Sequence, residues 1–104
     1  MTRASLAKLL ADAPWVLRGT VVTRYLKCKR RECDICRRQG GHGPHYYLST
    51  RGENGKTRMV YVRKGHLTEV QAAVARYKRL KEGLADLARR DLERWRRRTR
   101  RPRP

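Results

Sequence analysis

A chain of 104 residues is too short for two independent hydrophobic cores, and its 38% hydrophobic content includes no phenylalanine. We therefore expect one thin-cored domain, residues 1–93, which a bound metal would help to stabilise, followed by an arginine-rich tail, residues 94–104. The formal net charge is +19, and because near-balanced charge would suffice for solubility, this excess argues against a neutral partner and indicates a polyanion, most commonly nucleic acid.

Other features of the composition bear on partners and location. No apolar run approaches the roughly 20 residues of a membrane-spanning helix, no secretory signal is evident, and the clustered cysteines are typical of a reducing compartment. We expect a cytoplasmic protein, associated with the nucleoid or with ribonucleoprotein, that binds neither a membrane nor a small-molecule substrate. Arginine makes up 21 of the 28 basic residues, and its planar fork of donors suits phosphates and base edges.

The first 28 residues predict a short helix and a strand. Leu6, Leu9 and Leu10 recur at helical spacing within residues 1–13, with Ser5 as a candidate cap. The run from residue 19 to residue 28 is rich in β-branched and aromatic residues, which favours a strand that leads directly into a cysteine cluster.

That cluster has the spacing C-x4-C-x2-C-x5-H, formed by Cys28, Cys33, Cys36 and His42, with His45 three positions further on. Such ligands suit a tetrahedral Cys3His zinc site, and nearby glycines allow the tight backbone that a ligand loop requires. The residues alone allow three interpretations of this cluster: a structural zinc site, unligated or redox-active thiols, or a site for another metal. They also leave open whether His42 or His45 is the fourth ligand.

The run from Val22 to Ser49 that carries Cys28, Cys33, Cys36 and the segment Gly-His-Gly-Pro-His-Tyr-Tyr resembles a family of short prokaryotic proteins of unknown function. The similarity covers about residues 18–90 and implies a zinc-knuckle-like segment, a basic hairpin and a long C-terminal helix. The family pattern implies His42 as the fourth ligand, since an aromatic residue is expected where His45 stands. It also implies frequent proximity to mobile genetic elements, but no activity.

After the cluster, residues 45–51 and 57–64 predict a β-hairpin with a turn at Asn54-Gly55. A five-residue loop would pair Leu48 with Val60 and Tyr47 with Tyr61, giving one aliphatic face and one face of tyrosine and arginine. Tyr47, Tyr61 and Arg63 could then stack on unpaired bases, or they could simply pack against one another.

Residues 68 to about 98 predict one long helix that opens with a capping box, Thr68 to Gln71. Thirty residues would span roughly 45 Å, so the helix must extend well beyond a sheet of short strands. Its first half would pack on the aliphatic face through Val70 and Val74. The stripe of Leu80, Leu84 and Leu87 would form a homodimer, or the N-terminal helix would cover it.

The expected fold is therefore α+β: a short N-terminal helix, a small antiparallel three-stranded sheet with an inserted zinc-knuckle loop, and a long C-terminal helix that overhangs the sheet. The basic residues expected to contact nucleic acid fall in the loop and near the C-terminus. They are Lys27, Lys29, Arg30, Arg31, Arg37, Arg38, Arg94, Arg96, Arg97, Arg98, Arg100 and Arg101.

These features predict a non-enzymatic, zinc-stabilised protein that binds DNA or RNA mainly through the phosphate backbone. An assembly role is the alternative, in which the leucine stripe dimerises or docks on a larger nucleoprotein machine such as a transposase or a ribosome. Catalysis is disfavoured because four protein ligands would close the zinc shell, whereas a catalytic zinc keeps an open position.

Overall fold

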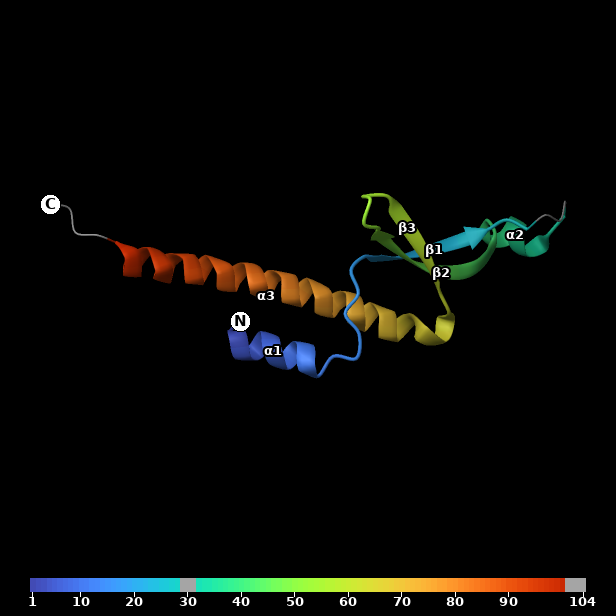
Figure 1. Cartoon of the computed structure of the whole chain (residues 1–104). Coiled ribbons are helices and arrows are strands. Elements are labelled where there is room, and N and C mark those ends of the chain that lie inside the picture. Colours follow the sequence, from blue (N-terminus) through green and yellow to red (C-terminus); the bar gives the residue numbers. More distant parts are fainter. Residues whose placement is uncertain (29–31, 101–104) are drawn as a thin grey trace.

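The computed structural model describes residues 1–28 and 32–100 and has the predicted α+β architecture (Figure 1). A short helix is followed by a three-stranded sheet with an inserted loop and then by one long helix. The elements are α1 (Arg3–Ala11), β1 (Thr20–Leu26), α2 (Asp34–Gln39), β2 (His42–Arg51), β3 (Thr57–Val62), the 3-10 turn η1 (Lys64–His66) and α3 (Leu67–Thr99).

The sheet has the order β1-β2-β3, with both pairs of strands antiparallel. The hairpin between β2 and β3 has the predicted register, with Leu48 opposite Val60 and Tyr47 opposite Tyr61. Gly55 has φ of +77° in its turn, a conformation that glycine adopts without steric cost. The loop length thus separates an aliphatic face from a tyrosine-bearing face.

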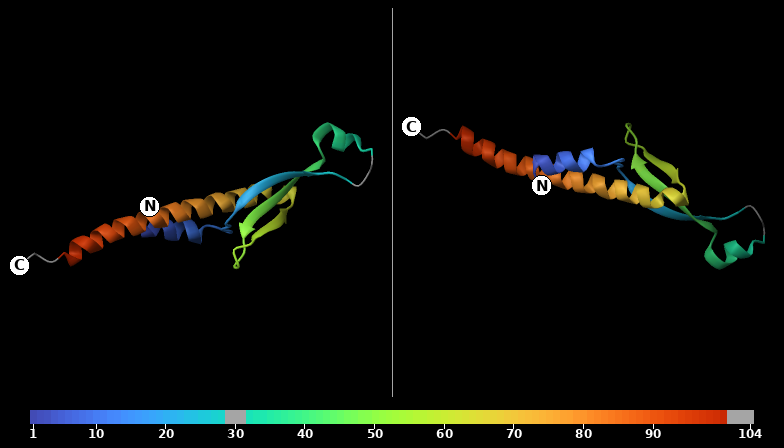
Figure 2. Two further views of the ribbon diagram at one scale, coloured as in Figure 1. Left: turned by 90° about the horizontal axis from the view of Figure 1, so that it is seen from above. Right: turned by 90° about the horizontal axis from the view of Figure 1, so that it is seen from below.

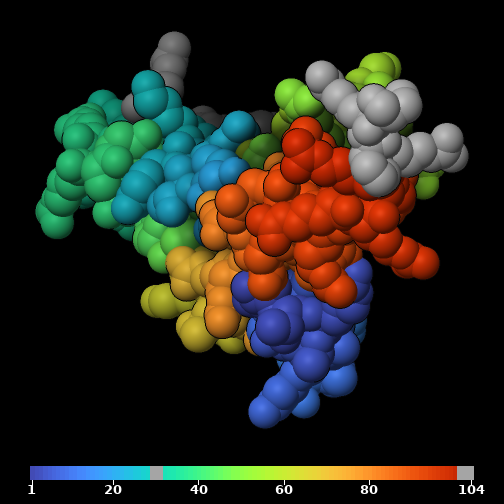
Figure 3. Space-filling view, turned by 90° about the vertical axis from the view of Figure 1, so that its left-hand side faces the viewer, coloured from blue at the N-terminus to red at the C-terminus, as the bar shows by residue number. Residues whose placement is uncertain are grey.

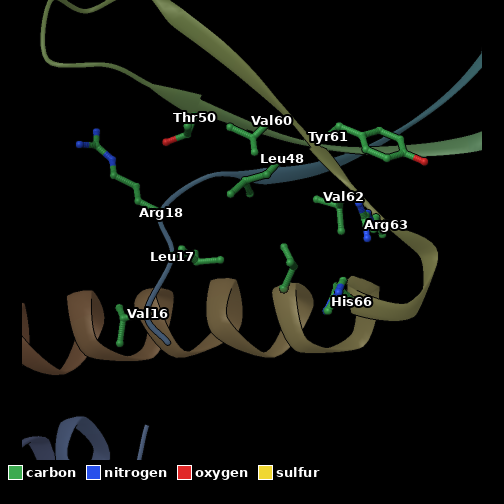
Figure 4. Close-up of a pocket in the computed structure, with 11 residues that line it drawn as sticks. Val16, Leu17, Arg18, Leu48, Thr50, Val60, Tyr61, Val62, Arg63 and His66 are labelled. Carbon is green, nitrogen blue, oxygen red and sulfur yellow. The ribbon is translucent and has the colours of Figure 1, made fainter. Parts of the chain in front are cut away.

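The hydrophobic core lies between the aliphatic face of the sheet and the N-terminal half of α3. Leu48, Val62 and Val74 form its centre, and Figure 4 shows the first two pointing from the sheet toward α3. Ala73 is fully buried, and its carbonyl accepts a hydrogen bond from the Leu17 backbone N–H at 3.3 Å. The core is small, as the composition predicts, and an apolar opening remains between β3 and α3.

Helix α1 packs antiparallel against the side of α3 opposite the sheet (Figures 1 and 3). Leu6 is buried there against Gly83, where a β-carbon would come within 3.0 Å of the leucine side chain. The N-terminal amine pairs with Asp86 at 3.4 Å, and Arg3 pairs with Asp91. Leu84 remains 60% exposed, which shows that α1 covers only one side of α3.

The molecule is strongly elongated, with principal extents of 83 × 30 × 24 Å. Its radius of gyration is 21.8 Å, against about 13 Å for a compact domain of this length. The C-terminal half of α3 projects beyond the sheet, as predicted, and the cysteine loop lies at the opposite end (Figure 2). Among the described residues, no helix combines the length and apolarity needed to cross a bilayer.

Several predicted boundaries were wrong. The cap of α1 is Thr2, whose hydroxyl accepts from the Ser5 backbone N–H, rather than Ser5 itself. The predicted capping box at Thr68 does not start α3, because η1 leads into the helix at Leu67, and its cap, His66, makes no side-chain capping hydrogen bond. Strand β2 begins at His42 rather than at His45, since residue 42 already pairs with Leu26 of β1.

Candidate metal centre

Four potential ligands come from three elements that meet beyond one end of the sheet. Cys28 lies two residues past the end of β1, and His42 opens β2. Because Leu26 pairs with His42, the chain leaving β1 and the chain entering β2 run side by side at this point. Cys33 is the N-cap residue of α2 and Cys36 lies in its first turn, so both sulfurs face the same strand ends.

Two glycines make the return from α2 to β2 possible. Gly40 ends α2 in the left-handed region, with φ of +75°, and its N–H donates to the Cys36 carbonyl at 2.9 Å. Gly41 is buried with φ of +149°, and a β-carbon there would lie 2.9 Å from the backbone of Tyr25 and Leu26. Only glycine permits this close approach, which brings His42 to the cysteines.

The four donor atoms converge. The sulfurs of Cys28, Cys33 and Cys36 and a ring nitrogen of His42 all lie within 4.8 Å of one another. The Cys33 sulfur is 3.2 Å from His42 Nε2, and the sulfurs of Cys28 and Cys36 are 3.6 Å apart. Donors bound tetrahedrally at about 2.3 Å from an ion are about 3.8 Å apart, so these residues fit a single metal ion.

The local hydrogen bonds favour a thiolate at Cys33. The backbone N–H of Cys36 is the main cause that lowers the pKa of Cys33 from 9.0 to about 6, and the Cys28 and Cys36 thiols and the Ile35 N–H act in the same direction. At Cys36 the Cys28 backbone N–H lowers the pKa, but burial and the neighbouring thiols outweigh it, and the net shift is upward. One ligand is therefore ready to bind metal near neutral pH.

His45 is not part of this cluster. It lies three residues along β2 and pairs with Arg24 of β1 within the sheet. A bulge falls between residues 42 and 45, and His45 lies further into the sheet than His42, away from the strand ends where the cysteines meet. Among the described residues, the cluster is Cys28, Cys33, Cys36 and His42.

A protein-family model described as a domain of unknown function, DUF6788, matches residues 3–72. The match covers more than half of the chain. The chain belongs to the DUF6788 family. No curated protein and no solved structure gives a significant match. The DUF6788 region contains α1, the whole sheet, all four cluster residues and the first turns of α3, whereas the arginine-rich part of α3 lies beyond it.

The predicted nucleic-acid-binding residues fall in separate places. In the DUF6788 region, Lys27, Arg37 and Arg38 are exposed beside the metal cluster, and Lys29, Arg30 and Arg31 lie outside the described residues. At the far end of α3, Arg94, Arg96 and Arg97 each pair with a carboxylate one turn earlier, at 3.7 to 3.9 Å, and are largely exposed. Arg98 and Arg100 are also exposed, and Arg101 lies outside the described part of the chain.

The tyrosines form the predicted pair on the sheet. The rings of Tyr47 and Tyr61 pack edge to face, with centroids 5.6 Å apart. The guanidinium beside them belongs to Arg24, whose Cζ lies 5.8 Å from the centre of the Tyr47 ring. Arg63 instead follows the end of β3 and lines the opening toward α3. Arg24 was not among the residues predicted to bind nucleic acid, although it stands two residues after Val22 on the same strand and therefore faces the same side.

Proposed function

We propose that this protein binds nucleic acid without catalysis and that its Cys3His cluster holds one structural zinc ion. The observation that carries the proposal is the convergence of four donors within 4.8 Å in a chain of net charge +19. Three thiolates and one imidazole are a donor set that zinc binds tetrahedrally, whereas iron–sulfur clusters normally require four thiolates. The ion would join the end of β1, the start of α2 and the start of β2 into one unit.

The donor set supports a structural rather than a catalytic role. Catalytic zinc keeps a position for water or substrate, and four protein ligands would fill a tetrahedral shell. A catalytic site also needs an acid or base beside the metal. Glu32 and Asp34 are the carboxylates of the loop, and both are exposed among basic residues. The zinc would therefore act by ordering the loop.

Two basic regions supply the proposed contacts with nucleic acid. Lys27, Arg37 and Arg38 are exposed and stand next to the cluster residues in the chain, and the arginines of residues 94–100 outnumber their neighbouring carboxylates at the other end of the molecule. Such residues bind phosphates, so affinity should depend steeply on salt and little on sequence. These contacts would serve DNA and RNA alike and would place the protein with the nucleoid or with ribonucleoprotein.

Replacement of one ligand tests the proposal. Cys33→Ala should lower the thermal midpoint and weaken oligonucleotide binding together, because metal binding and folding of the loop are coupled. Gln39→Ala is the matched control, since Gln39 lies on the same short helix, is exposed and is neither basic nor a ligand. Thermal melting and fluorescence anisotropy of a labelled oligonucleotide measure the two effects. Unchanged melting and binding in Cys33→Ala would contradict the proposal.

An assembly role is a second candidate, supported by the exposed side of α3. Leu80, Leu84 and Ala88 line a shallow apolar groove with Val16, and Leu84 is 60% exposed. Exposed leucines at helical spacing can pair with a second copy or dock on a larger complex. Light scattering on nucleic-acid-free protein distinguishes the candidates: a dimer that Leu84→Glu dissociates supports assembly, and a monomer that binds oligonucleotide supports the first proposal.

A further inference from the structure

The sheet has an outer face, turned away from α3, that carries Val22, Arg24, Tyr47, Met59 and Tyr61. Val22, Tyr47 and Tyr61 lie directly opposite one another on the three strands and so share one face. Figure 4 shows the Tyr61 ring on the side of β3 away from α3, whereas Val62 points toward the helix. In the described structure no element covers this face, since α3 packs on the opposite face and α1 packs on α3.

The aromatic groups on the outer face leave a flat surface open. In the edge-to-face pair of Tyr47 and Tyr61, an edge of one ring meets a face of the other, so the second face of each ring takes no part. Tyr47 is further covered by the Arg24 guanidinium, whereas Tyr61 is 57% exposed. Tyr61 therefore offers an aromatic surface to a flat partner, and Arg24, over the neighbouring Tyr47 ring, holds a positive charge on the same face.

The charge of the sheet points to an anionic partner. None of the residues of β1, β2 and β3 is acidic, whereas Arg24 and Arg51 are exposed on the outer face and Arg58 is exposed on the opposite one. A partner that is both flat and anionic is a nucleobase on its phosphate backbone. In a duplex the bases are stacked on one another and cannot reach an aromatic side chain, but in a single strand they can.

We propose that the outer face binds single-stranded nucleic acid, with an unpaired base stacked on Tyr61 and a phosphate beside Arg24. This rests on the proposed function and adds to it a preference for single strands over duplexes. The phosphate contacts of the loop and of α3 serve both kinds of nucleic acid, whereas the ring serves only unpaired bases. Loss of the ring should therefore remove the preference and leave duplex binding intact.

The test compares a labelled single strand of about 15 nucleotides with the matching duplex on the full chain, under reducing conditions with zinc. Tyr61→Leu keeps the apolar bulk and removes the ring, so single-strand affinity should fall about tenfold while duplex affinity stays within about twofold. Tyr61→Phe keeps the ring and should bind as the parent does. Val60→Ala is the matched control, because Val60 is the neighbouring residue of the same strand and lies opposite Leu48 on the aliphatic face, so it should leave the preference unchanged.

The outcomes separate the two proposals. If Tyr61→Leu weakens neither ligand, weakens both equally, or acts no more strongly than Val60→Ala, stacking on the outer face is overturned while salt-sensitive duplex binding still supports the proposed function. If the parent protein binds neither oligonucleotide, the proposed function itself is wrong, and the stacking proposal is overturned with it. Thermal melting of each variant shows that the fold is retained.

Discussion

Single residues decide whether the cysteine loop can hold an ion. His42 lies 3.2 Å from the Cys33 sulfur because Gly41 allows the chain to pass against the backbone of β1. His45, only three residues away, pairs with Arg24 in the sheet. The spacing of the cysteines was sufficient to predict the cluster, but the residues alone could not choose between the histidines. The choice depends on where β2 begins, and that is set by pairing with β1.

The two histidines provide a matched pair of variants. His42→Gln should lower zinc affinity by about 10- to 100-fold or more, because it removes a ligand from a four-donor shell. His45→Gln should leave zinc affinity unchanged. Competition with a chromogenic chelator measures both. Equal effects of the two substitutions, or a larger effect at His45, would show that the ligand set is wrong.

The lowered pKa of Cys33 gives a pH prediction for the metal-free protein. The Cys36 N–H and the neighbouring thiols stabilise the thiolate, so one thiol should ionise near pH 6, far below the ordinary value of 9.0. The stability that this thiolate provides is present in full above pH 9 and is lost as the pH falls through about 6. Thiolate absorbance should show a transition near pH 6 that Cys33→Ser removes, and a transition that persists in this variant would refute the assignment.

At the scale of elements, local sequence predicted the strands better than the helix ends. The register of the hairpin followed from one loop length, since a shift of one residue would have placed Tyr61 or Met59 opposite Leu48 and mixed the two faces. Helix α2 was not predicted because half of its six residues are charged and the segment has no apolar periodicity. Backbone hydrogen bonds to the carbonyls of Cys33 and Cys36 hold it. The predicted start of α3 lay one residue late, because the 3-10 turn η1 leads the chain into the helix at Leu67, before the capping sequence.

The core between the sheet and α3 is so small that truncation of one side chain should lower the free energy of unfolding clearly. Leu48 is 7% exposed at its centre, so Leu48→Ala should destabilise the zinc-loaded protein by about 2–5 kcal/mol. Val60, directly opposite on β3, is 39% exposed, so Val60→Ala should lower the free energy of unfolding by clearly less than Leu48→Ala does. Chemical denaturation measures both. Equal costs would mean that the sheet does not pack on α3 as described.

At the scale of the whole molecule, the long helix separates two basic regions. The metal cluster and the arginines of α3 lie toward opposite ends of a particle 83 Å long. The sequence predicted this overhang from helix length alone, whereas the place of α1 required the structure. Leu6 packs on Gly83, so α1 covers one side of α3 and leaves Leu84 exposed. A glycine in a long helix gave no sign by itself that a second helix would pack there.

Deletion of residues 94–104 tests the role of the projecting end. The deletion removes seven arginines. The slope of log affinity against log salt concentration should therefore become less steep, by the amount that corresponds to several lost phosphate contacts. The domain should stay folded, because the core and the metal cluster lie elsewhere. Anisotropy titrations over a range of salt concentrations measure the slope. An unaltered slope would mean that these arginines do not contact the ligand.

The most direct measurement is the metal content of the full chain purified under reducing conditions, by elemental analysis together with native mass spectrometry. The convergence of Cys28, Cys33, Cys36 and His42 predicts about one zinc ion per chain, lost together with the ordered loop when a chelator is added. Folded protein that contains no metal, and whose melting a chelator does not change, would contradict the zinc site and the ordered basic loop built on it.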